Sequence, residues 1–181
     1  MGGKCLFGNG SCCVTVVMAR STHDPIKIAR HWYLDILSGP ADSNPDPMEP
    51  YFSESDDLIG QIFSPDYVNN VLPAPKGGWK RGVEGARQVL RMYRGASPDL
   101  RIQIDKQWVE GNKVMTRYTV TATHTGRAFF GKKANGKRYS VTGQHTDVIE
   151  NGKFVESSGG WDVENLAAQM GIPKEAAVLG G

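Results

Sequence analysis

The residues best suited to chemistry lie on one predicted strand near the C-terminus. His145 and Asp147 occur in the stretch VTGQHTDVI, and alternate residues of a strand point to the same side of a sheet. A histidine in a cavity can transfer protons because its pKa lies near neutrality, whereas a core histidine stays neutral and hydrogen-bonded. The strand alone favours the core role for His145. It also favours a solvated strand end for Asp147, beside the predicted turn at Asn151-Gly152.

Four more side chains are candidates for the lining of a site. Tyr67 and Asn69, in SPDYVNN, follow a predicted helix and either point inside or serve a turn. His124 closes the predicted strand TVTATHTG, where a strand-end or core role competes with a pocket role. Trp161 is expected to pack as an aromatic and to wall any cavity beside it.

Several classes of protein are excluded or disfavoured by composition. The sequence contains no P-loop, dinucleotide fingerprint, HExxH, CxxC or GxSxG motif. A net charge of +2 gives no reason to expect nucleic-acid binding, and no segment is long and apolar enough to span a membrane. The three cysteines, Cys5, Cys12 and Cys13, lie in the first 13 residues and have no histidine at zinc spacing. No metal site is therefore predicted, and the cysteine-free remainder suits the cytoplasm.

The chain is predicted to hold one domain. Residues 1–20 are interpreted as a disordered leader, because glycine and polar residues at positions 8–11 interrupt the apolar stretch that a signal peptide needs. Residues 21–175 form the domain, and residues 176–181 form a flexible tail.

Helices are predicted in the first half of the domain. Pro25 suits a first helical position, and Ile28, Trp32 and Ile36 recur at four-residue spacing as an apolar stripe. Residues 40–54, rich in Pro, Asp, Asn and Ser, are a loop insertion. Two further helices are predicted in SDDLIGQIF and GVEGARQVLRMYRG.

The periodicity changes to two residues from Asp99 onward. The pattern predicts about four strands, with turns at Gly111-Asn112 and Asn151-Gly152, before a short helix at residues 166–170. Helices followed by an antiparallel meander predict an α+β domain, with the helices packed on one face of a strongly curved sheet.

Five stretches, taken together, resemble the SnoaL-like polyketide cyclases, an ester-cyclase branch of the nuclear transport factor 2-like superfamily. They are SPDYVNN, GVEGARQVL, SPDLRIQIDKQWVEGNKVMTRYTVTATHTG, SVTGQHTDVIENGK and WDVENLAAQMGI. The resemblance implies a cone-shaped barrel of a curved, mainly antiparallel sheet, with three N-terminal helices over its concave face and a deep pocket between. It also implies a homodimer through the sheet, a small-molecule ligand, and neither a metal nor an organic cofactor.

The resemblance also assigns roles. In the cyclases an aspartate on the last strand is the acid/base of an intramolecular aldol ring closure, assisted by a histidine and an asparagine. By position the histidine is His145 and the asparagine is Asn69, with Tyr67 beside it. The aspartate's place falls on Gly159, and its polar strand neighbour falls on Ser157. The small residues are therefore expected to enlarge and neutralise the pocket floor.

Three functions compete on these residues. The first is a cofactor-free cyclase or isomerase of secondary metabolism, with His145 as the catalytic acid/base. The second is a small-molecule-binding or protein-interaction module without catalysis, suggested by Gly159 in place of the acid. The third, an epoxide hydrolase, needs Arg117 and Asp147 to activate water and lacks a clearly placed second carboxylate. The candidate substrate contacts are Asn69, Tyr67, Ser157, Gly159, Trp161, Asp147 and His124.

Overall fold

The computed structural model describes residues 24–39 and 57–172. The predicted leader at residues 1–20, the insertion at residues 40–54 and the tail at residues 176–181 lie outside the described residues. The three cysteines lie in the same undescribed N-terminal part.

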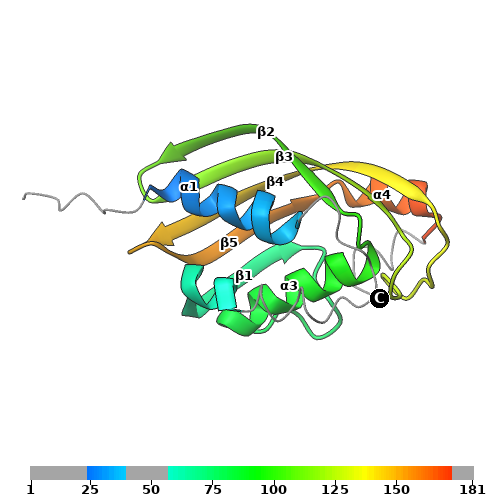
Figure 1. Cartoon of the computed structure of the whole chain (residues 1–181), viewed down its shortest axis with the longest axis horizontal. Coiled ribbons are helices and arrows are strands. Elements are labelled where there is room, and N and C mark those ends of the chain that lie inside the picture. The colour runs from blue at the N-terminus through cyan, green and yellow to red at the C-terminus, as the bar shows by residue number, and fades with distance from the viewer. Residues whose placement is uncertain (1–23, 40–56, 173–181) are drawn as a thin grey trace, which may run out of the picture.

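A five-stranded sheet forms the body of the protein (Figure 1). Its spatial order is β1-β5-β4-β3-β2, and its strands are β1 (Phe63–Leu72), β2 (Arg101–Glu110), β3 (Lys113–Thr123), β4 (Arg138–Glu150) and β5 (Lys153–Trp161). Neighbouring strands from β2 to β5 are antiparallel, whereas β1 runs parallel to β5. The predicted α+β class and mainly antiparallel sheet are confirmed.

The edge strand β1 was not predicted from the sequence. Its stretch SPDYVNN contains proline, aspartate and asparagine, which strands disfavour and turns favour. The edge position tolerates them, because the pairing of β1 with β5 is irregular between Phe63 and Val68, and Pro65 lies inside that interval. From Val68 onward the pairing is regular, so Tyr67 and Asn69 belong to a strand rather than to a turn.

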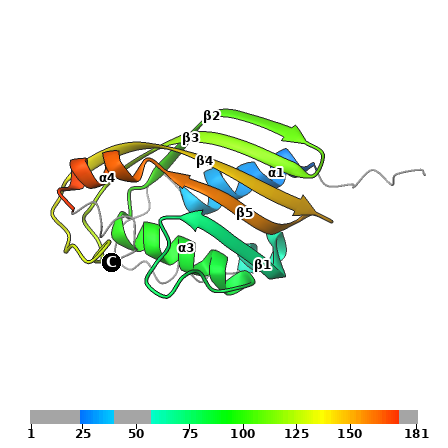
Figure 2. The same cartoon turned by 180° about the vertical axis from the view of Figure 1, so that it is seen from behind.

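The helices lie against one side of the curved sheet. Helix α1 (Pro25–Arg30), capped by Asp24, continues as a wider π-helical segment, η1 (His31–Leu37). A short helix at residues 57–62 and helix α3 (Val83–Ala96) complete the set that precedes β2. Helix α1 passes in front of the sheet in Figure 1 and behind the strands in the reverse view of Figure 2.

The core fills the space between the sheet and these helices. It contains the apolar stripe predicted on the first helix, with Trp32 and Ile36 both buried. Helix α4 (Val163–Met170), capped by Asp162, follows β5 and buries Leu166 and Met170. Among the described residues no helix has the length and apolarity needed to cross a bilayer.

The β4–β5 hairpin places the chemically interesting residues. On β4, Val141, Asp147 and Ile149 are buried at alternating positions, so this row of residues faces the helices. Across the ladder His145 pairs with Gly159, and Asp147 pairs with Ser157. The site therefore draws its polar residues from adjacent positions on two neighbouring strands.

Candidate active site

A narrow cavity opens between the inner face of the sheet and helices η1 and α3. Its free space is about 420 Å³ including its mouth, but only about 20 Å³ is wide enough for the centre of a water molecule. Aromatic and aliphatic walls narrow it, among them Trp32, Tyr93 and Trp161. The polar side chains that line it are Tyr67, Asn69, Tyr118, His145, Asp147 and Ser157.

Asp147 lies buried on the floor of this cavity. Its side chain is only 1% exposed, which contradicts the solvated strand end favoured by the sequence. The Ser157 hydroxyl donates to Asp147 Oδ1 at 2.5 Å, and the Tyr33 hydroxyl donates to Oδ2 at 2.7 Å. Burial raises the pKa of Asp147 from its ordinary 3.8 to about 6, although these two hydrogen bonds oppose the rise. The expected neutral floor is therefore wrong, because a carboxylate reaches it from β4.

His145 lies between two tyrosines. Its Nδ1 is 2.9 Å from the Tyr33 hydroxyl, and its Nε2 is 3.0 Å from the Tyr118 hydroxyl. Burial lowers the pKa of His145 from 6.5 to about 4, because desolvation penalises the imidazolium. The ring is therefore neutral at physiological pH, and both of its nitrogens are already hydrogen-bonded.

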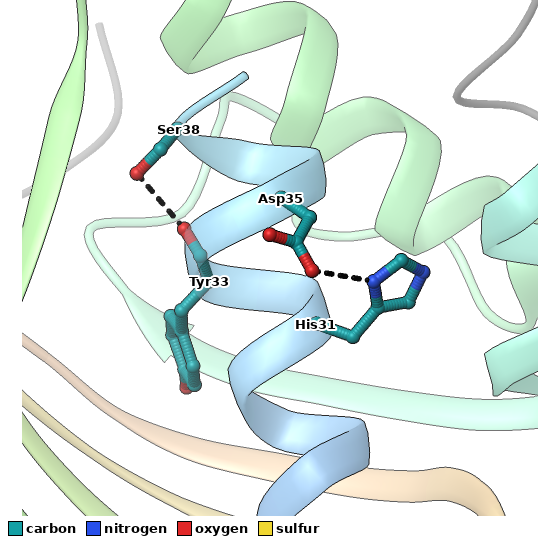
Figure 3. Close-up of polar contacts among 4 residues, drawn as sticks. All are labelled: His31, Tyr33, Asp35 and Ser38. Atoms are coloured by element: carbon teal, nitrogen blue, oxygen red, sulfur yellow. Dashed lines mark hydrogen bonds and ion pairs between the residues drawn. The ribbon is translucent and has the colours of Figure 1, made fainter. Parts of the chain in front are cut away.

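Tyr33 reaches the site from η1. Figure 3 shows its side chain leaving the helix toward the strands, while His31 and Asp35 pair with each other elsewhere on the helix. The backbone of Tyr33 is held by Ser38, which follows the last residue of η1, because the Ser38 hydroxyl donates to the Tyr33 carbonyl at 3.0 Å. Ser38 Oγ also accepts from the Ile102 backbone N–H at 2.9 Å, which fixes the helix to β2. Π-helical turns often occur at functional sites, and this one carries Tyr33.

Tyr118 on β3 reaches His145 because its partner on β4 has no side chain. Tyr118 pairs with Gly143, and a Cβ at that glycine would lie 2.6 Å from Cζ and 2.7 Å from the hydroxyl of Tyr118. The glycine thus lets the phenol ring lie across β4. Burial raises the pKa of Tyr118 well above its usual range, Tyr93 adds to the rise, and a hydrogen bond from Trp161 opposes it.

Two further polar groups in the cavity wall have no partner. The Asn69 side chain is 9% exposed, and its Oδ1 accepts from the Val71 backbone N–H at 2.9 Å, which leaves Nδ2 unpaired. The Tyr93 hydroxyl is also buried without a hydrogen bond, although its ring stacks on Trp161 at 4.4 Å. Unpaired buried donors are costly, and these two belong to residues that line the cavity.

Three sequence-derived candidates lie outside the cavity. Gly159 is exposed, and its φ of +120° together with its close approach to the Gln144 carbonyl suits only glycine. His124 is fully buried beside Phe129 and is 3.0 Å from the Arg127 carbonyl, so it is a core histidine. Arg117 lines an outer hollow, whereas Asp147 faces inward, which removes the basis for an epoxide hydrolase.

Sequence reasoning missed three tyrosines that the structure brings to the site. Tyr33 and Tyr93 lie in predicted helices and Tyr118 lies in a predicted strand, and none of them is among the candidates for the site. A tyrosine on an apolar stripe carries a hydroxyl that needs a partner when buried, and this signal was available in the sequence. The described residues contain no cluster of His, Cys, Asp and Glu suited to a metal ion.

Residues 51–170 match the model of the SnoaL-like polyketide cyclase family. The chain belongs to this family. The match spans the strands that line the cavity and α3, and the SnoaL-like resemblance of the sequence is confirmed. No curated protein matches the chain.

Solved structures share the SnoaL-like fold. TsrD from Streptomyces laurentii is 25% identical, with a TM-score of 0.58 over 82% of this chain and 93% of its own. AclR from Streptomyces galilaeus, a candidate hydroxylase, is 27% identical, with a TM-score of 0.53 over 67% of this chain and 86% of its own. IdmH from Streptomyces antibioticus, a candidate polyketide cyclase, is 21% identical, with a TM-score of 0.60 over 83% of this chain and 100% of its own. At that identity IdmH supports the fold alone.

Proposed function

We propose that this protein is a cofactor-free enzyme that cyclises or isomerises a polyketide-like or other secondary metabolite by acid/base chemistry. Asp147 is the group that finally accepts the proton taken from a carbon beside a carbonyl. The observation that carries the proposal is the buried carboxylate of Asp147 on the floor of an apolar cavity. Family membership supports the reaction class.

Asp147 suits this role better than His145. A general base works best when its pKa lies near the working pH, and the pKa of Asp147 is about 6. His145, with a pKa near 4, is too weak a base to hold a proton at neutral pH. The acid/base role therefore belongs to Asp147 rather than to His145, and His145 is its neutral neighbour.

The carboxylate stands close to the place that the family's aspartate would occupy. Ser157 and Gly159 lie on β5, and Asp147 approaches the same floor from β4, directly opposite Ser157. The acid absent at residue 159 is thus supplied by the neighbouring strand. Tyr67 lies beside it, and burial raises the pKa of Tyr67, so that tyrosine stays neutral and acts only through hydrogen bonds.

The two unpaired donors of the cavity wall are suited to stabilise the intermediate of this reaction. Removal of a proton from the α-carbon leaves its electron pair on the carbonyl oxygen as an enolate, which Asn69 Nδ2 and the Tyr93 hydroxyl can stabilise. The enolate carbon then attacks a second carbonyl carbon of the same molecule and forms the new C–C bond. The resulting alkoxide takes back the proton held on Asp147, so the product is an isomer of the substrate.

The test compares Asp147→Asn with Asp105→Asn, which neutralises a surface carboxylate that only bonds Thr119. A panel of linear poly-β-keto esters is incubated with each protein, and ring closure is followed as a chromatographic shift at constant mass. Asp147→Asn should lower kcat by about 10²–10⁴-fold, and Asp105→Asn should leave it unchanged. Equal turnover in both variants would reject the proposal, and binding without turnover by the wild type would favour a non-catalytic binding module instead.

The homodimer implied by the family resemblance stays a prediction. Sedimentation equilibrium of the full chain measures its mass directly, and a monomer at micromolar concentration would contradict it.

A further inference from the structure

The hydrogen bonds around His145 fit only one arrangement of hydrogen atoms when Asp147 is ionised. Tyr33 has a single hydroxyl hydrogen and donates it to Asp147 Oδ2 at 2.7 Å. At its second contact, 2.9 Å from His145 Nδ1, the Tyr33 oxygen must therefore accept. The hydrogen of the neutral imidazole consequently lies on Nδ1.

The same reasoning fixes the other side of the ring. With its hydrogen on Nδ1, His145 presents a lone pair at Nε2, so the Tyr118 hydroxyl donates to it across 3.0 Å. The donors thus point one way through four residues, from Tyr118 to His145 to Tyr33 to Asp147. Tyr118 lines the cavity, and having given its hydrogen to Nε2, it presents oxygen lone pairs to a ligand.

We propose that Tyr118 is a catalytic residue whose oxygen takes the substrate's proton, and that Asp147 acts through a proton chain formed by Tyr33 and His145. The proposal rests on the proposed function of Asp147 and specifies its route. As the substrate proton reaches the Tyr118 oxygen, the Tyr118 proton moves to His145 Nε2. The Nδ1 proton then moves to Tyr33, and the Tyr33 proton moves to Asp147. One proton leaves the substrate and one arrives on the carboxylate.

The proton chain also explains the second half of the reaction, in which the proton returns to the substrate. After the transfer every hydrogen bond has reversed, so Tyr118 now holds a hydroxyl hydrogen that His145 no longer accepts. Tyr118 can therefore donate to the enolate or alkoxide oxygen, and the protons return along the same path. One device supplies both the base and the acid that ring closure needs.

Two observations support the indirect route. Both oxygens of Asp147 are already hydrogen-bonded, to Ser157 and Tyr33. Tyr33 is completely buried behind the cavity and so can meet no substrate itself.

The positions of these side chains are secured by separate elements. Gly143 leaves room for the Tyr118 ring, and Ser38 holds the backbone of Tyr33. The rings of Tyr33 and Tyr118 also contact each other, with centroids 5.5 Å apart. The proton chain is therefore preorganised before any ligand arrives.

The test measures proton abstraction alone, with 2-tetralone as a flat carbon-acid probe whose exchange in D₂O is followed by proton NMR. Tyr118→Phe and Tyr33→Phe should each lower the plateau exchange rate by about 10²–10⁴-fold. Adding Asp147→Asn to Tyr118→Phe should lower the rate no further, because residues that act as one unit are not additive. Tyr139→Phe removes a buried hydroxyl that donates to Ser97, outside the cavity, and should leave exchange unchanged.

The outcomes separate this proposal from the proposed function. If Asp147 abstracts the proton directly, Tyr33→Phe shifts the acid limb of the pH–rate profile and keeps the plateau, which overturns the chain and leaves Asp147 as the base. If Asp147→Asn exchanges as fast as the wild type, or if the wild type itself shows no catalysed exchange, both proposals fail. Nitrogen-15 NMR of the free protein provides an independent check, because a neutral His145 with its hydrogen on Nε2 at pH 7 reverses the chain and rejects it.

Discussion

Asp147 on β4 lies directly across the ladder from Ser157 on β5, and the serine hydroxyl donates to the carboxylate at 2.5 Å. Strand β5 carries Ser157 and Gly159 at this end of the sheet, and the pairing places a carboxylate from β4 beside them. The hydrogen bonds from Ser157 and Tyr33 keep the carboxylate in place, and its desolvation keeps its pKa close to neutrality.

The pH dependence of stability should expose two opposing contributions. The pKa of Asp147 is raised to about 6, so the folded protein holds a proton that the unfolded chain has lost, and stability falls as pH rises from about 4 to 6. The pKa of His145 is lowered from 6.5 to about 4, so stability rises with pH over nearly the same range. The neighbouring tyrosines, Tyr33, Tyr67 and Tyr118, stay neutral throughout because their pKa values are raised.

In Asp147→Asn only the histidine contribution remains. Relative to the wild type, the free energy of unfolding of this variant should rise by about 3 kcal/mol between pH 4 and pH 6.5, at 1.36 kcal/mol per pKa unit. Urea denaturation at a series of pH values measures this difference in the free energy of unfolding. Titration of the surface groups contributes equally to both proteins and therefore cancels. Parallel stability curves for the two proteins would show that burial does not raise the pKa of Asp147.

Restoring an acid at residue 159 should fail. Gly159 has a φ of +120°, and a Cβ there would collide with the Gln144 carbonyl and lie 3.0 Å from the His145 Cα. Gly159→Asp should therefore lower stability by about 2 kcal/mol or more, without a gain in turnover. Ser158→Ala, at the next position, is the control and should be close to neutral. A stable Gly159→Asp protein with higher activity would show that the cavity reaches residue 159.

Gly143→Ala should separate Tyr118 from His145 without removing any ionisable group. The added methyl would lie within 2.7 Å of the Tyr118 hydroxyl, so the ring must move away from the position in which it donates to Nε2. Turnover should fall to the level of Tyr118→Phe while the fold, followed by circular dichroism, persists. Gly60→Ala is the matched control, because nothing lies within 4 Å of its Cβ position. Unchanged turnover in Gly143→Ala would contradict the role of the Tyr118 contact.

Ser38→Ala should destabilise the protein through Tyr33. The substitution leaves the buried Ile102 N–H without an acceptor and removes one of the two hydrogen bonds to the Tyr33 carbonyl, which still accepts from the backbone N–H of residue 38. An unsatisfied buried donor costs about 1–3 kcal/mol, so the midpoint of urea denaturation should fall accordingly. Ser64→Ala removes a serine hydroxyl that accepts from the exposed Asp66 backbone N–H, and it provides the control because that N–H can turn to water. Equal midpoints for the two variants would mean that Ser38 does not anchor η1.

Tyr93→Phe should stabilise the free protein and weaken ligand binding. The Tyr93 hydroxyl is buried without a partner, so its removal relieves a penalty of about 1–3 kcal/mol in the absence of ligand. A ligand that presents an acceptor to this hydroxyl loses that hydrogen bond, and its Kd rises. Thermal unfolding and calorimetric titration with 2-tetralone measure the two effects. A variant that is less stable and binds equally well would assign Tyr93 to the core alone.

The sequence by itself determined the class of fold and much of its local order. Periodicity located the first helix, α3 and the strands from β2 onward, and Asn151-Gly152 located the turn between β4 and β5. Strand alternation also placed His145 and Asp147 on one face. These features depend on residues close together in the chain, so short-range patterns are sufficient to predict them.

Only the tertiary structure decided which polar groups meet. Tyr33 bonds His145 across 112 positions of sequence and Tyr118 bonds it across 27, and no local pattern contains such pairs. Strand β1 forms from a turn-like stretch because the free edge of β5 accepts it. The protonation states of Asp147 and His145 depend on how completely η1 and the aromatic walls exclude water from them. That desolvation is a property of the packed molecule, because it comes from side chains brought together from distant parts of the chain.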